Sequence, residues 1–206
     1  MSNKIIQIFN KIENSIGLIE NIPELTRRSA ILIPVLCPKN DFENNILDIK
    51  NWKLIFTIRS DHLKEHAGEV SFPGGRIDHG ENPKETAIRE ANEEIALEVS
   101  QIISTIKLND SYARSGYHIV PYCSLIINDN NLICNENEVR FIVKISIQDL
   151  LKINSWSEER SIMQLTRKVW HFPTHIYGIG DIDIWGATGN ILKDFLIRIE
   201  NILIEY

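Results

Sequence analysis

The spacing of apolar residues predicts how the first part of the chain folds. Isoleucine and phenylalanine recur at steps of three and four residues between positions 5 and 19, which predicts an amphipathic helix that ends before Pro23. We expect its apolar face to pack on the rest of the chain or on a second subunit, so a homodimer is one expectation. Continuous apolar runs predict buried strands at 30–36 and 52–58, and a short strand at 69–72.

The same patterns extend through the rest of the chain. They predict strands at 117–127, 140–145 and 175–185, and helices at 83–96, 147–152 and 188–203. Residues 153–167 are mostly polar and are expected to form a mobile surface loop. Strands and helices alternate without a regular strand–helix–strand period, so we expect an α/β fold with a mixed sheet and helices on both faces. The expected organisation is an N-terminal helical extension at 1–28 and a single domain at 29–206.

Composition and charge narrow the function classes. The 206 residues carry a net charge of -6, which argues against a broad basic face for nucleic acid or a membrane surface. A small polyanionic substrate stays compatible, because a few local cations can hold it. Three scattered cysteines without a C-x-x-C pair indicate neither a disulfide scaffold nor a zinc site. With no apolar run long enough to span a membrane and no signal peptide, a cytoplasmic protein is expected.

The predicted helix at 83–96 gathers acidic residues on one side. Asn82 is a suitable N-cap and Pro83 suits the first helical position, so the helix has a defined start. Glu90, Glu93 and Glu94 follow at spacings that bring their carboxylates together, where like charges repel. Such oxygen ligands suit Mg²⁺ or Mn²⁺. A solvated acidic helix face is the alternative.

The spacing around this helix resembles the signature of the Nudix hydrolases. The matching positions are Gly75, Glu81, Arg89, Glu90, Glu93 and Glu94. The resemblance implies a Nudix α/β/α sandwich that binds a divalent metal and hydrolyses a diphosphate linked to another moiety. It further implies that Glu90 and Glu94 are the main metal ligands and that Glu93 and the carbonyl of Gly75 assist.

Two residues of the signature are expected to have a structural role, and one position departs from it. Arg89 can pair with Glu81 and so tie the preceding loop to the helix. Ala96 stands where the family usually has glycine. Glycine there would suit a left-handed helix cap, which costs alanine about 1 kcal/mol. Either the helix runs slightly longer here or the following loop is shifted.

Upstream motifs resemble the coenzyme A pyrophosphatase branch of this family. Residues 57–60 read Thr-Ile-Arg-Ser, residues 63–68 fit Leu-x-x-His-x-Gly, and residues 72–75 read Phe-Pro-Gly-Gly. Residues 115–117 (Ser-Gly-Tyr) and 185–188 (Trp-Gly-Ala-Thr) resemble that branch as well. The resemblance implies cleavage of coenzyme A, or of its thioesters, to 3′,5′-ADP and 4′-phosphopantetheine.

These motifs suggest which residues bind the substrate and which activate the attacking water. The candidate substrate-binding residues are Arg59, Lys64, His66 and Arg76. Glu69 or Glu138 could orient or deprotonate the water, with Glu93 as a third catalytic candidate. Two other functions stay open: hydrolysis of another nucleoside diphosphate derivative such as ADP-ribose or NADH, and a non-catalytic nucleotide-sensing module. The sequence does not choose between Mg²⁺ and Mn²⁺, or between free, oxidised and acylated coenzyme A.

Overall fold

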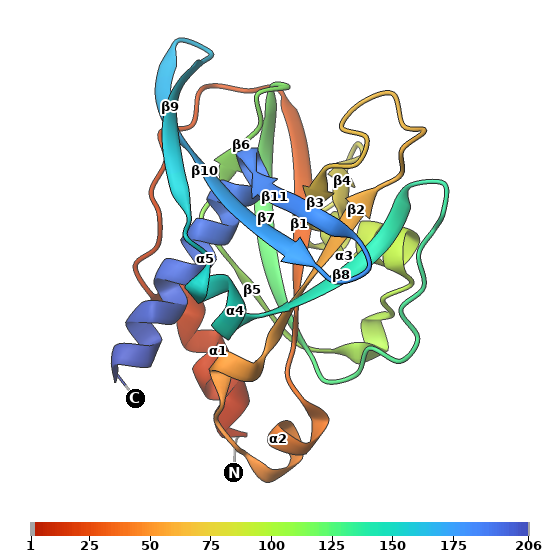
Figure 1. Ribbon diagram of the computed structural model, residues 1–206, viewed down its shortest axis with the longest axis vertical. Coiled ribbons are helices and arrows are strands. Elements are labelled where there is room, and N and C mark those ends of the chain that lie inside the picture. The colour runs from red at the N-terminus through yellow and green to blue at the C-terminus, as the bar shows by residue number, and fades with distance from the viewer. Residues whose placement is uncertain (1–2, 206) are drawn as a thin grey trace.

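A large mixed sheet forms the centre of the computed structural model, which describes residues 3–205 (Figure 1). Its long strands are β1 (Arg27–Leu36), β2 (Lys53–Arg59) and β7 (Tyr117–Ile126). β1 and β7 pair in parallel along their whole lengths, whereas β2 pairs with β1 in the antiparallel direction. The predicted mixed sheet is therefore confirmed, and the predicted strands at 30–36, 52–58 and 117–127 lie at its centre.

Five further strands belong to this sheet. They are β3 (Val70–Ser71), β4 (Gly74–Arg76), β5 (Ile102–Lys107), β6 (Ser111–Tyr112) and β8 (Val139–Ser146). The order along the sheet is β3-β2-β1-β7-β5, with β4 paired to β1, β6 to β7 and β8 to β2. The sequence patterns predicted β3 and β8 but neither β5 nor β6.

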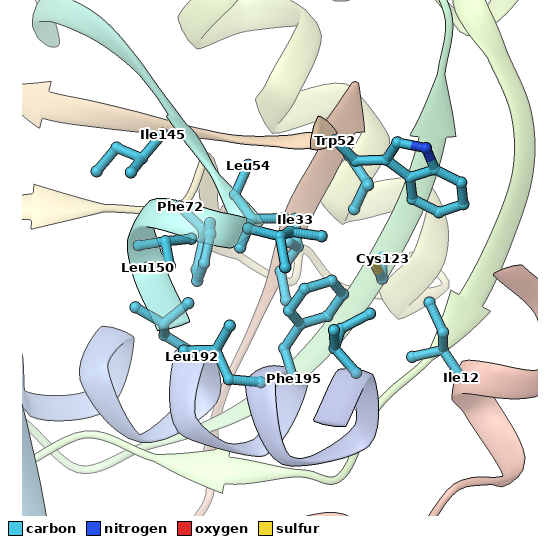
Figure 2. Packing of buried hydrophobic residues seen from close by; sticks show 14 of the residues in the cluster. Ile12, Ile33, Trp52, Leu54, Phe72, Cys123, Ile145, Leu150, Leu192 and Phe195 are labelled. Atoms are coloured by element: carbon cyan, nitrogen blue, oxygen red, sulfur yellow. The ribbon is translucent and has the colours of Figure 1, made fainter. Parts of the chain in front are cut away.

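Helices cover both faces, which confirms the expected α/β/α sandwich. α3 (Pro83–Ile95) packs on one face, and α1 (Lys4–Asn14), α4 (Ile147–Lys152) and α5 (Gly186–Glu205) pack on the other. Strand alternation divides the core: Ala30 and Leu32 of β1 join the cluster under α3, whereas Ile33 and Val35 join the opposite cluster. Figure 2 shows this second cluster, in which Ile12, Cys123 and Phe195 belong with Ile33. The remaining short helices are α2 (Lys39–Asn44) and two 3₁₀ turns, Ile49–Asn51 and Val99–Gln101.

A separate three-stranded antiparallel sheet replaces the predicted loop at 153–167. It consists of β9 (Trp156–Ile162), β10 (Leu165–Ile176) and β11 (Gly180–Trp185). The loop prediction is wrong because β9 is an edge strand that lacks a continuous apolar run. The turn between β9 and β10 is also not predicted by the sequence, because it lacks the usual Asn-Gly pair. Its central residues, Met163 and Gln164, adopt φ of 52° and 65°. The predicted strand at 175–185 is interrupted by a turn at 177–179.

The N-terminal helix is shorter than predicted. α1 ends at Asn14, and the side chains of Ile16 and Ile19 are exposed by 78% and 84%. The helix stops because Arg198 of α5 donates from Nη1 to the carbonyl oxygens of Ile12, Glu13 and Ser15 at 2.8–3.0 Å. Tertiary hydrogen bonds thus override the apolar spacing.

The apolar face of α1 is covered within the chain. Ile5, Ile8, Phe9 and Ile12 are buried in the same cluster as α5. This face therefore gives no support to the expected homodimer. The boundary between an extension at 1–28 and a domain at 29–206 stays a prediction, and residues 1 and 2 lie outside the described part. None of the described helices is both long and apolar enough to cross a bilayer.

Candidate active site

The loop before α3 is held to the helix by one half-buried ion pair. Asn82 caps the helix, its Oδ1 accepting from the Lys84 amide at 2.9 Å. Arg89 donates from Nε and Nη2 to the two carboxylate oxygens of Glu81 at 2.9 and 3.1 Å, and Thr86 Oγ1 donates to Glu81 at 2.7 Å. Hydrogen bonds from Arg89 and Thr86 lower the pKa of Glu81 to about 2. This pair fixes the loop geometry and keeps Glu81 ionised.

Glu90 points from the helix onto the glycine loop. Its side chain is 14% exposed, and a Cβ added to Gly75 would lie 2.4 Å from its carboxylate oxygen Oε1. A side chain at position 75 would therefore displace the Glu90 carboxylate from the loop. Burial raises the pKa of Glu90, while the Arg89 guanidinium, 2.9 Å away at Nη1, opposes the shift.

Glu94 is more deeply buried than Glu90, and one of its carboxylate oxygens is left without a hydrogen bond. The residue is 3% exposed, and its Oε2 has no hydrogen-bond partner among the described residues. Burial raises its pKa to about 8, with Glu138 and Glu90 adding to the shift and Arg59 opposing it. Buried polar atoms normally find partners, so this oxygen marks a place for a bound group.

Glu93 differs from its two neighbours. Its side chain is 51% exposed, and its carboxylate accepts from Arg89 Nη1 at 3.1 Å. The three carboxylates therefore do not share one environment: Glu90 and Glu94 face the glycine loop, whereas Glu93 faces solvent.

The two candidate water-activating groups lie on different segments. Glu138 precedes β8, its carbonyl accepts from the Ser60 amide at 2.9 Å, and its charge raises the pKa of both Glu90 and Glu94. Glu69 pairs instead with His66 Nδ1 at 2.9 Å in the loop before β3. His66 adopts φ of 58° and so also shapes that turn. Glu138 is the candidate that faces the helix carboxylates.

The donor set fits a hard divalent cation. It offers the unpartnered Glu94 oxygen, the Glu90 carboxylate and the adjacent backbone of Gly75, all of them oxygen donors of the kind Mg²⁺ and Mn²⁺ prefer. Within residues 3–205 no three His, Cys, Asp or Glu side chains are arranged so that they could hold a metal ion together, and Arg89 contacts Glu90. Metal binding would therefore compete with Arg89 for Glu90.

A cleft of about 890 Å³ opens onto the glycine loop. Of the predicted substrate residues, Arg59, His66 and Arg76 line it together with Glu69 and Gly75, whereas Lys64 is exposed and not among the lining residues. Sequence reasoning missed several further lining residues: Arg27, Arg114, Arg160 and Arg167. Trp185, which belongs to a motif found in the sequence, lines the cleft as well. Arg27 could have been found, because it lies two residues before Ser29 at the start of β1 and shares its face.

An aromatic stack supports the far wall of the cleft. The rings of Trp156 and His171 lie 4.0 Å apart, and those of His171 and Trp185 lie 5.7 Å apart, nearly parallel in both cases. The guanidinium carbon of Arg160 is 5.2 Å from the Trp185 ring centroid. These residues come from the small sheet, so the segment predicted as a loop forms a wall of the cleft.

Comparisons with known proteins agree with this geometry. A model of the NUDIX domain matches residues 45–166. Two proteins named "Uncharacterized Nudix hydrolase NudL", from Yersinia pestis (strain Pestoides F) and Yersinia pseudotuberculosis serotype O:1b (strain IP 31758), are each 30% identical over 168 residues, covering 81% of this chain and 77% of the relative. A crystal structure of a MutT/nudix family protein from Enterococcus faecalis has a TM-score of 0.52 at 14% identity, covering 100% of this chain and 76% of that one. The structural likeness concerns the fold.

Proposed function

The chain belongs to the Nudix hydrolase family, and on that premise we propose that it hydrolyses the diphosphate of coenzyme A or of its thioesters with a divalent metal ion. The products would be 3′,5′-ADP and 4′-phosphopantetheine. The broader assignment, a hydrolase of nucleoside diphosphate derivatives, does not depend on this choice of substrate.

One observation carries the proposal: the unpartnered Glu94 oxygen adjoins a cleft with many arginines. Gly74 and Gly75 line the cleft, and the backbone of Gly74 hydrogen-bonds the Glu94 carboxylate. A substrate in the cleft would therefore meet carboxylates that suit a metal and guanidinium groups that suit phosphate oxygens. Coenzyme A, with three phosphate groups, matches this charge. The resemblance of residues 57–75 to the coenzyme A branch supports the same substrate.

The metal would be held by Glu90 and Glu94, assisted by Glu93 and the Gly75 carbonyl. When bound, Mg²⁺ or Mn²⁺ supplies charge neutralisation on the diphosphate and a water of lowered pKa. Arg59 would bind the diphosphate oxygens, Arg76 would bind another anionic group of the substrate, and His66 would hold the loop that carries Glu69. Glu138, whose charge acts on Glu90 and Glu94, would accept the proton of the attacking water. A bond forms from water oxygen to phosphorus as the bond to the leaving phosphate breaks.

The test measures products from a panel of substrates. Purified protein is incubated with coenzyme A and Mg²⁺ or Mn²⁺, with EDTA in a parallel tube, and products are resolved by mass spectrometry. Metal-dependent release of 4′-phosphopantetheine supports the proposal. Intact coenzyme A beside cleaved ADP-ribose or NADH would overturn the substrate assignment. No turnover of any diphosphate by folded protein would favour a nucleotide-sensing module.

A further inference from the structure

The arginines that line the cleft fall into two groups. Arg160 and Arg167 are paired with Glu158 and Glu20. Arg27, Arg59, Arg76 and Arg114 also line the cleft, but across residues 3–205 none of them forms an ion pair with a carboxylate. No carboxylate ion pair therefore occupies the guanidinium groups of this second group, which are available to a bound anion.

Two of these four arginines, Arg27 and Arg76, contact one tyrosine, Tyr117. Arg27 and Tyr117 are register partners across the parallel β1–β7 pair. The guanidinium carbon of Arg27 lies 5.3 Å from the Tyr117 ring centroid, and Arg76 Nη2 donates to Tyr117 Oη at 2.8 Å. Tyr117 thus holds the guanidinium groups of Arg27 and Arg76 on the same side of the cleft.

The turn between β6 and β7 brings in the third, Arg114. The Gly116 amide donates to the Ala113 carbonyl at 3.0 Å, and the Ala113 amide donates to the Tyr117 carbonyl at 2.9 Å. Arg27 Nη1 also donates to the carbonyl of Ser115, at 3.2 Å. These bonds close the turn that carries Arg114 and attach it to Arg27.

We propose that Arg27, Arg76 and Arg114 form a subsite for a phosphate monoester that the substrate carries apart from its diphosphate. A monoester has a charge of about −1.5 to −2 at neutral pH, which suits several forked guanidinium donors. The inference rests on the proposed function, because the 3′-phosphate of coenzyme A is such a group. The diphosphate itself lies with the metal and with Arg59, whose charge acts on Glu94.

The strand provides a matched pair of variants, Arg27→Gln and Arg28→Gln. Arg28 is the next residue of β1 and points to the opposite face, since Arg27 and Ser29 line the cleft and Arg28 does not. Activity is measured on coenzyme A and on its 3′-dephospho form. We expect Arg27→Gln to lower kcat/KM for coenzyme A by about tenfold and that for dephospho-coenzyme A by less than about twofold, as for loss of a charge-assisted hydrogen bond. Arg28→Gln should leave both values unchanged.

Two results would overturn the subsite. An equal loss on both substrates in Arg27→Gln would mean that Arg27 acts on the diphosphate. The same loss in Arg28→Gln would mean that Arg27 acts only through general electrostatic attraction of the substrate.

A binding measurement separates the failure of this inference from that of the proposed function. Calorimetry with 3′,5′-ADP and with AMP needs no turnover. We expect tighter binding of 3′,5′-ADP by about tenfold, with the advantage lost in Arg27→Gln. If coenzyme A is not cleaved but this advantage is present, the substrate proposal fails and the subsite stands. Equal affinity for the two nucleotides in the wild-type protein would refute the subsite whether or not coenzyme A is cleaved.

Discussion

Two buried carboxylates, Glu94 on α3 and Asp194 on α5, have nearly the same exposure and opposite surroundings. They are 3% and 4% exposed, and burial raises the pKa of both. Asp194 is fully engaged: Oδ2 accepts from Arg198 Nε at 3.0 Å and Oδ1 from Asn109 Nδ2 at 3.3 Å. Glu94 retains an oxygen without a partner.

The difference separates a structural charge from a functional one. The Asp194–Arg198 pair fastens the N-terminal segment, because Arg198 also caps α1. The fold satisfies that pair completely and gains rigidity from it. Burying Glu94 without a partner for this oxygen costs stability, as expected for a ligand of the proposed metal ion.

The largest effect is expected from Glu94→Gln. Loss of a main metal ligand should lower metal-dependent kcat by about 10³-fold, on the order of 4 kcal/mol of transition-state stabilisation. The loss is measured as the turnover of whichever substrate the wild-type protein cleaves in the substrate panel described above. Glu85→Gln, an exposed position on the first turn of the same helix, is the control and should turn over normally. Near-normal activity of Glu94→Gln would remove Glu94 from the site.

The same variant should remove one component of the pH dependence of stability in EDTA. The pKa of Glu94 rises from 4.5 to about 8 on folding, so between these values the folded state binds the extra proton. Stability of the metal-free protein should therefore fall as pH rises from about 4.5 to 8, by roughly 4 kcal/mol. Denaturant unfolding at several pH values measures it. Glu94→Gln should lose this component and be the more stable protein at pH 8; parallel curves for the two proteins would contradict the assignment.

Arg198→Ala tests the region around Asp194, where the buried carboxylate is paired. Removing it leaves Asp194 buried without its cation and frees three carbonyl oxygens of the α1 terminus, so we expect a loss of about 3 kcal/mol. Thermal and denaturant unfolding report the change, and activity of the folded fraction should persist. The double variant Asp194→Leu/Arg198→Met should lose less, because no charge is then left unpaired. A double variant that is less stable than Arg198→Ala would contradict this account.

Ala96→Gly should give the smallest effect. Ala96 ends α3 in the left-handed conformation with φ of 54°, and the Leu97 amide reaches back to the Ala91 carbonyl at 3.3 Å. The helix therefore does not run past the usual end of the signature. Glycine should stabilise the protein by about 1 kcal/mol without changing activity. An unfolding midpoint equal to or below that of the wild type would show that the alanine is unstrained.

The sequence by itself determined the features that depend on local spacing. The positions of Glu90 and Glu94 on one helix follow from its 3.6-residue period, its start follows from Asn82 and Pro83, and the central strands follow from continuous apolar runs. The glycine at 75 and the arginine at 89 were identified by the signature, and their contacts with Glu90 and Glu81 give each a physical role.

Only the tertiary structure decided which of these groups is unpaired and which segments surround them. Arg198, far along the chain, ends α1 where the apolar spacing continues. Polar β9 becomes a strand because β10 pairs with it, and it brings Arg160 to the cleft. Arg27 gains its partner Tyr117 only through a parallel pairing across 90 residues of sequence. Strand pairing and burial arise from contacts between segments that are distant in the sequence, and local periodicity does not predict those contacts.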